Sequence, residues 1–102
     1  MAESADSVLK WLQEFYLSHC DGEWEHQSGC TIQTLDNPGW MFDFDLEGPL
    51  ENKAFEPVKI RRTENDWVDC RVEGNKFRGA CGPNNLTELL VIFRDWTTKA
   101  RT

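Results

Sequence analysis

The segment Trp40–Leu46 alternates, residue by residue, between a large apolar face and a more polar one. The apolar face consists of Trp40, Phe42, Phe44 and Leu46, and the other face of Met41, Asp43 and Asp45. This pattern is typical of a β-strand that buries one face and exposes the other to water. Any fold of this chain must therefore cover one side of a sheet and leave the opposite side open.

Four further segments are predicted as strands, at residues 30–35, 58–63, 67–72 and 76–81. Turn-forming residues separate most of them: Asp36–Gly39, Glu64–Asp66 and Glu73–Asn75. A longer loop, Glu47–Pro57, follows the alternating strand. Because short connections make successive strands antiparallel neighbours, we expect an antiparallel meander.

Two helices are predicted to enclose this run of strands. The first, Ser4–Ser18, carries an apolar stripe at i, i+3, i+4 and i+7, and Ser4 is its expected N-cap. The second begins after Asn85, which with Glu88 forms a capping-box-like pair, and ends near Thr98. It is apolar almost all round, so we expect it to be largely buried.

These elements predict one α+β domain over residues 1–102, a length typical of a single domain. The expected architecture is an antiparallel β-meander of about five strands, with an N-terminal and a C-terminal helix packed on one face.

Charge is distributed unevenly along the chain, whose net charge is −7. Up to Glu51 there are eleven acidic side chains and a single lysine, whereas the rest has ten basic and seven acidic side chains. Such acidity argues against nucleic acid or an anionic membrane as the partner. It suits a basic protein partner, because complementary potentials accelerate encounter. The alternative is that the acidity serves only solubility.

The cellular location is expected to be cytoplasmic. No stretch approaches the roughly 20 apolar residues of a membrane span, and the first residues lack the pattern of a secretory signal. The four cysteines, at positions 20, 30, 70 and 81, contain no C-x-x-C pair. We therefore expect reduced thiols that act as small apolar side chains.

Two kinds of chemical site are alternatives to a purely binding role: a zinc site and a pair of carboxylates. His19, Cys20, His26 and Cys30 lie close together in sequence, but they lack the tight ligand pair typical of structural zinc. Paired carboxylates such as Asp43 and Asp45 arise on any solvated strand face. We expect no catalytic residue, no metal and no cofactor.

The alternative function is that of a small rhodanese-like sulfurtransferase using Cys70. The segment from Cys70 to Lys76 is faintly similar to the active loop of that class, in which a thiolate of low pKa lies in an electropositive cradle. Against this alternative, Cys70 is in phase with Val68 and Val72 on the apolar face of a predicted strand, and the loop is one residue too long.

Three strings together resemble a known family: WLQEFY at 11–16, CDGEWEH at 20–26 and TLDNPGW at 34–40. The chain resembles the immunity protein 53 family of bacterial polymorphic toxin systems, and the resemblance continues through Leu50–Asn52 and Phe55. It implies a protein that binds a toxin and thereby protects the cell that makes it. The resemblance carries no catalytic residue.

The sequence thus predicts a non-enzymatic immunity protein that neutralises a cognate, basic toxin through an acidic face. The expected partner-binding residues are Asp21, Glu23, Trp24, Glu25, Asp43, Asp45 and Glu47. Trp24 is either an exposed anchor for the partner or a lid on the core, since hot spots favour Trp within a polar rim. Nothing in the sequence indicates an oligomeric state.

Overall fold

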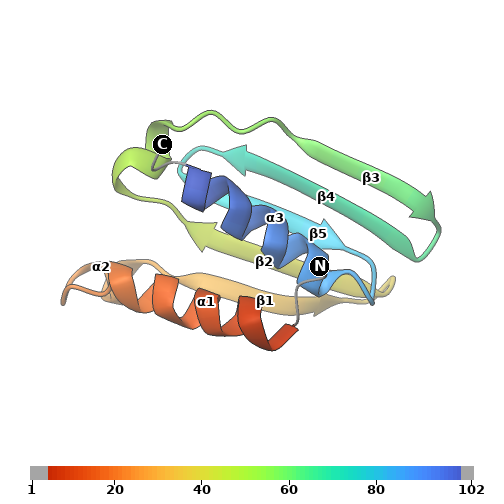
Figure 1. Ribbon diagram of the computed structural model, residues 1–102, viewed down its shortest axis with the longest axis horizontal. Coiled ribbons are helices and arrows are strands. Elements are labelled where there is room, and N and C mark those ends of the chain that lie inside the picture. Colours follow the sequence, from red (N-terminus) through yellow and green to blue (C-terminus); the bar gives the residue numbers. More distant parts are fainter. Residues whose placement is uncertain (1–4, 100–102) are drawn as a thin grey trace.

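The computed structural model of the chain describes residues 5–99. Figure 1 shows two long helices, α1 (Ala5–His19) and α3 (Leu86–Lys99), beside a single sheet. The sheet contains β1 (Cys30–Leu35), β2 (Gly39–Asp45), β3 (Val58–Thr63), β4 (Asp66–Glu73) and β5 (Lys76–Cys81). Two short elements that the sequence did not predict lie in the connections: helix α2 (Trp24–Gln27) and the 3-10 helix η1 (Gly48–Asn52).

The five strands pair antiparallel in the order β1-β2-β5-β4-β3. The predicted α+β class and antiparallel sheet are therefore confirmed. The order departs from a simple meander at one connection, because β2 pairs with β5 and the chain passes through η1 to place β3 at the far edge.

Burial and charge account for this departure. Phe77, Gly79 and Cys81 on β5 are all buried, so β5 takes the central position where both its edges and its inner face are covered. Strand β3 carries Lys59, Arg61 and Arg62, and charged side chains of this kind are typical of an edge strand.

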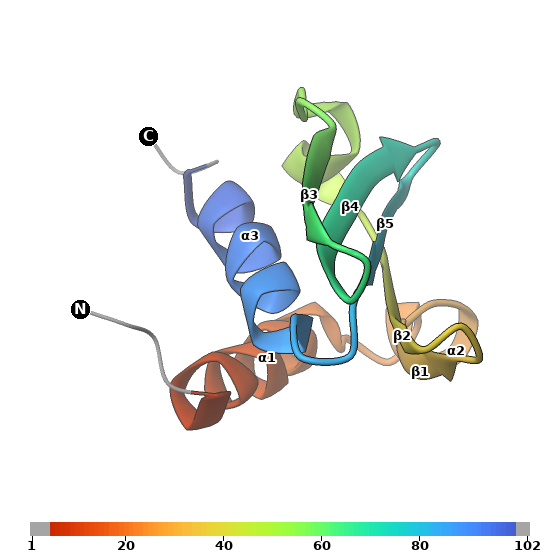
Figure 2. The same cartoon turned by 90° about the vertical axis from the view of Figure 1, so that its right-hand side faces the viewer.

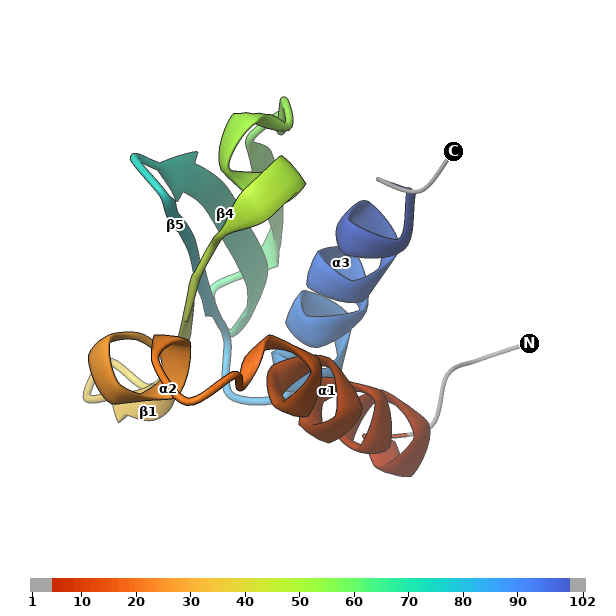
Figure 3. The same cartoon turned by 90° about the vertical axis from the view of Figure 1, so that its left-hand side faces the viewer.

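Both long helices lie on the same side of the sheet, as Figures 2 and 3 show from opposite directions. Phe93 of α3 lies at the centre of the layer between them, with its ring centroid 5.1 Å from that of Phe42 and 4.7 Å from that of Phe77. Phe15 of α1 contacts Phe93 and Phe44 at 5.7 and 5.2 Å. The predicted packing of both helices on one face is confirmed.

The predicted Asn85–Glu88 pair is present at the start of α3, and Asn85 has further hydrogen-bond partners. The predicted cap Ser4 lies outside the described residues. At α3, the Asn85 side chain bonds other side chains and the neighbouring strand: its Nδ2 donates to Glu88 Oε1 and to Asp66 Oδ1, at 3.1 and 2.9 Å. Its Oδ1 accepts the Trp67 N–H at 3.3 Å. The Asn85–Glu88 pair therefore exists, and it also fastens the start of α3 to β4.

Candidate functional site

The structure brings the sequence-predicted partner residues to one end of the molecule, where β2 ends, α2 turns and η1 begins (Figure 1). Asp21, Glu23, Trp24 and Glu47 line a common hollow of about 210 Å³. Asp43 and Asp45 line a neighbouring hollow of about 310 Å³. Gln27 and Ser28 of the α2 turn border both hollows, so the two groups adjoin each other.

The turn before α2 is held by its own carboxylates. Asp21 Oδ1 accepts the N–H groups of Glu23 and Trp24, both at 3.0 Å. The Glu25 carboxylate accepts the N–H groups of Asp21 and Gly22, at 2.9 and 2.8 Å. Gly22 has a φ of 95°, a conformation that a residue with a Cβ rarely adopts. The sequence CDGEWEH therefore specifies a compact turn as well as a charged one.

The same hydrogen bonds keep these two carboxylates ionised. Donation from the backbone N–H of Trp24, and then from that of Glu23, holds the pKa of Asp21 below its ordinary value. Backbone hydrogen bonds, first from its own N–H and then from those of Asp21 and Gly22, lower the pKa of Glu25. Both groups stay negative at neutral pH in fixed positions.

We name the carboxylates around this turn the acidic end, defined as Asp21, Glu23, Glu25 and Glu47. Within residues 5–99, no lysine, arginine or histidine forms an ion pair with any of the four. Several carboxylates elsewhere do form ion pairs, as Asp66 and Glu88 do with Arg62. Apart from the backbone hydrogen bonds to Asp21 and Glu25, the negative charge of the acidic end is thus left to solvent or to a partner.

The two sheet carboxylates differ from the acidic end. Asp43 lies opposite Arg78 and Asp45 opposite Lys76 in the β2–β5 register. Lys76 Nζ is 3.3 Å from Asp45 Oδ1, and Arg78 Nε is 4.0 Å from Asp43 Oδ1. The exposed face of the sheet therefore carries mixed charge. Sequence reasoning did not identify Lys76 and Arg78 as partners of the two carboxylates, because it did not predict that β5 pairs with β2.

Trp24 is buried, with 8% of its surface exposed. Its ring stacks on Phe44 at 5.7 Å and lies 5.1 Å from the ring of His19 and 5.6 Å from that of Tyr16. Of the two sequence-based interpretations, this geometry fits the lid on the core. The Nε1 atom of Trp24 is buried and has no acceptor among the described residues.

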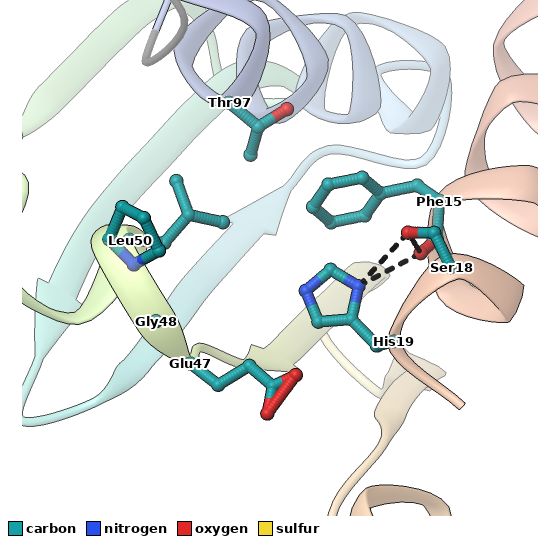
Figure 4. A pocket seen from close by; sticks show the side chains of 8 residues that line it. Phe15, Ser18, His19, Glu47, Gly48, Leu50 and Thr97 are labelled. Carbon is teal, nitrogen blue, oxygen red and sulfur yellow. Dashed lines mark hydrogen bonds between the residues drawn. The ribbon is translucent and has the colours of Figure 1, made fainter. Parts of the chain in front are cut away.

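A larger hollow, of about 530 Å³, opens beside the acidic end between α1, η1 and α3 (Figure 4). Phe15 and Leu50 form apolar walls, and His19 and Glu47 contribute polar groups. The Nδ1 atom of His19 donates to the Phe15 carbonyl oxygen at 2.9 Å. Figure 4 shows the other ring nitrogen on the side of the hollow.

Glu47 borders this hollow and the one beside Trp24. It therefore links the acidic end to a partly apolar depression. Sequence reasoning missed this depression because it took Glu47–Pro57 as a loop. The available signal was Gly48-Pro49, which places proline in the first turn of η1, where its fixed φ is tolerated.

The zinc candidates do not converge. In the described part of the chain, no three His, Cys, Asp or Glu side chains form a group that could hold a metal ion. The Cys20 thiol instead donates to the Tyr16 carbonyl at 3.5 Å, and His19 bonds within α1.

Cys70 lies inside the core, with 3% of its surface exposed. Burial raises the pKa of its thiol to about 12, and burial likewise raises the pKa of neighbouring Cys81 to about 11. Sulfur transfer requires an accessible thiolate of low pKa. The surroundings of Cys70 therefore oppose the rhodanese-like alternative.

Comparison with known proteins shows to which family the chain is similar. The family model described as Immunity protein 53 matches residues 9–98 of the 102-residue chain. No curated protein and no solved structure matches the chain. Among the helices within residues 5–99, none has the length and apolar character needed to cross a membrane.

Proposed function

The chain belongs to the immunity protein 53 family, and on this premise we propose that it is a non-enzymatic inhibitor that binds its cognate toxin through the acidic end. The partner is a basic protein surface, because four ionised carboxylates attract and orient such a surface during encounter. The protein acts by covering the toxin and has no reaction of its own.

The unpaired charge of the acidic end is the observation that carries this proposal. Lys76 and Arg78 partly offset Asp45 and Asp43 on the sheet, whereas the acidic end has no ion pair within the described residues. A protein gains little stability from unpaired like charges gathered in one place, since they repel one another. A basic partner converts this repulsion into attraction.

The rigidity of the turn supports the same role. Asp21 and Glu25 are already fixed by backbone hydrogen bonds, at 2.8 to 3.0 Å. Binding therefore costs little additional side-chain entropy at these two positions. No backbone group of the described residues bonds the carboxylates of Glu23 and Glu47, so these two side chains can adjust to lysine or arginine side chains on the partner.

The depression beside Glu47 gives the contact an apolar component. A basic side chain has a long aliphatic stem that packs on apolar surface while its charged head meets a carboxylate. Leu50 and Phe15 supply that apolar surface, and Glu47 stands at its rim. Where the toxin acts on nucleic acid, the carboxylates take the place of phosphates in its substrate groove.

The test is calorimetric titration of the toxin domain at two salt concentrations with wild type and with the double variant Glu23→Lys/Glu47→Lys. Neither carboxylate bonds another described residue, so the fold is expected to persist. We expect tight wild-type binding that weakens with salt. The variant is expected to bind at least about tenfold more weakly, which is about 1.4 kcal/mol.

The matched control is Asp36→Lys/Glu64→Lys, which changes the net charge by the same amount. These residues lie in the β1–β2 and β3–β4 turns, at the opposite end of the molecule from α2 (Figure 1). A smaller loss of affinity in the control places the contact at the acidic end. Equal losses in the two double variants would show that only net charge matters and would refute the proposed site.

A further inference from the structure

Strand β1 is an edge of the sheet, and nothing within residues 5–99 covers or protects it. Edge strands normally carry charge, proline or a bulge, which prevent pairing with other chains. The opposite edge, β3, has three basic side chains and a register shift between Arg61 and Thr63. Strand β1 has the sequence CTIQTL, with no charged residue and no proline, and its register with β2 is unbroken.

The register fixes which backbone groups of β1 face outward. The Asp45 N–H donates to the Gly29 carbonyl at 3.0 Å, and Cys30 lies opposite Phe44. Because hydrogen-bonded and non-hydrogen-bonded pairs alternate in an antiparallel ladder, Thr31, Gln33 and Leu35 bond β2. The N–H and C=O groups of Cys30, Ile32 and Thr34 therefore point away from the sheet. No side chain or loop within residues 5–99 bonds them.

An apolar side chain is exposed at the same edge. Ile32, on the face of β1 that faces the helices, keeps 38% of its surface exposed. The outward-facing backbone groups and this uncovered apolar side chain therefore lie on the same strand.

We infer that β1 pairs with β1 of a second copy of this chain, antiparallel and about a two-fold axis at Ile32. Ile32 is the middle one of the three residues whose backbone groups face outward, with Cys30 two residues before it and Thr34 two residues after it. If all three residues form hydrogen bonds to the second copy, Ile32 lies opposite Ile32 of that copy and Cys30 lies opposite its Thr34. Opposed residues share a face, so both pairs of helices lie on one side of a continuous sheet.

Charge favours a second copy over a strand of the basic toxin. A basic strand would meet no carboxylate along β1, whereas an uncharged strand pairs with its own copy without repulsion. The antiparallel arrangement sets the two acidic ends at opposite ends of the paired strands. The strands are six residues long, so the two ends are roughly 20 Å apart. Such charges are largely screened, because the Debye length is about 8 Å at physiological salt.

The contact is small, so the dimer forms reversibly as concentration rises. One strand pair and a few apolar side chains bury a surface area at the low end of the range of specific interfaces. This inference does not depend on the proposed function, because it concerns the protein without its toxin.

Sedimentation velocity over a dilution series tests the inference with wild type, Ile32→Pro and Ile32→Val. We expect a monomer–dimer equilibrium for wild type and for Ile32→Val, which keeps both backbone groups. Proline removes an outward N–H that β2 does not use, and proline is tolerated at such edge positions. Ile32→Pro is therefore expected to keep its circular dichroism and to remain monomeric.

Cross-linking tests the register. In Thr34→Cys, the new thiol lies opposite Cys30 of the second copy, at the Cα separation of about 5.5 Å that suits a disulfide. Oxidised glutathione is expected to convert this variant to a covalent dimer. The control Gln33→Cys places the thiol on the other face, opposite Thr31, and is expected to stay largely monomeric.

Two results would overturn the inference. One is that the wild type sediments as a monomer at every concentration up to its solubility limit. If Ile32→Pro also weakened toxin binding in that case, the strand added to β1 would come from the toxin. The other is equal cross-linking of Thr34→Cys and Gln33→Cys, which would show random collision. Neither result changes the comparison of the two double variants that tests the acidic end.

Discussion

At the scale of single residues, the same side chains shape the structure and belong to the proposed contact surface. Asp21 and Glu25 accept backbone hydrogen bonds that shape the turn before α2, and they also supply half of the carboxylates of the acidic end. Trp24, which lies between these two residues in the sequence, closes the core over Phe44. The acidic end is therefore anchored directly to the hydrophobic core.

Stability is expected to depend on the ionisation of Asp21. Its folded-state pKa lies below the ordinary value of 3.8 because Trp24 and Glu23 donate to it. Its stabilising effect is therefore complete above pH 3.8 and is lost as pH falls through the lower folded value. Asp21→Asn keeps the acceptor oxygen but removes the charge.

Urea unfolding at a series of pH values measures this dependence. Wild type is expected to be more stable than Asp21→Asn at neutral pH, and the difference in unfolding free energy is expected to shrink as pH falls below 3.8. A difference that stayed constant over this range would show that the charge of Asp21 does not contribute.

At the scale of elements, Asn85 connects α3 to β4, two elements that are not consecutive in the chain. It is buried, with 7% of its surface exposed, and it bonds Asp66 and Trp67 of β4 as well as Glu88 of α3. The packing of α3 on the sheet thus depends on a polar side chain as well as on its apolar face.

Asn85→Ala is expected to destabilise the protein by about 1–3 kcal/mol, because it leaves buried polar groups without their partners. The neighbouring Asn84→Ala is the control: Asn84 is exposed and no described residue bonds its side chain, so its effect should be within about 0.5 kcal/mol. Chemical denaturation of both variants measures the difference. Equal effects would indicate that only the turn conformation matters.

Local pattern predicted the elements but not all of their neighbours. The alternation in Trp40–Leu46 identified β2 because one strand face is buried, and that signal is contained in seven consecutive residues. The pairing of β2 with β5 joins segments far apart in the chain and is decided by burial of Phe77 and Gly79 under α3. Helix α2, with four residues, is too short to show a helical period.

The candidate site was predictable to a similar degree. The charged residues of CDGEWEH could be selected from sequence, since they gather in one acidic segment. The sequence could not show that the acidic end lacks ion pairs whereas Asp43 and Asp45 are partly paired, because that difference depends on Lys76 and Arg78 lying opposite β2. It could not show the depression beside Glu47 either, because residues of α1, η1 and α3 come together there only in the folded protein.

At the scale of the whole molecule, one aromatic cluster holds every layer together. Phe93 contacts rings from α1 and the sheet, among them Phe15, Phe42 and Phe77. Its side chain is fully buried. Helices and sheet therefore share one core and are expected to unfold together.

Phe93→Ala is expected to lower the free energy of unfolding by about 3–5 kcal/mol. That loss is a large part of the total of about 5–15 kcal/mol typical of such domains. Leu17→Ala, at a position that is 68% exposed, should change stability by less than about 0.5 kcal/mol. Unfolding followed by tryptophan fluorescence and by circular dichroism should coincide; separate transitions would contradict a shared core.

The strand order has a consequence for the chain as it leaves the ribosome. The β1–β2 hairpin is synthesised early, but the second edge of β2 stays open until residues 76–81 emerge to pair with it. Until then Phe42 and Phe44 lack the strand that pairs beside them, and Phe44 also lacks Phe93 of α3, whose ring lies 5.2 Å away. Because Trp24 stacks on Phe44, the core contact beneath the turn before α2 is completed only after both β5 and α3 have been synthesised.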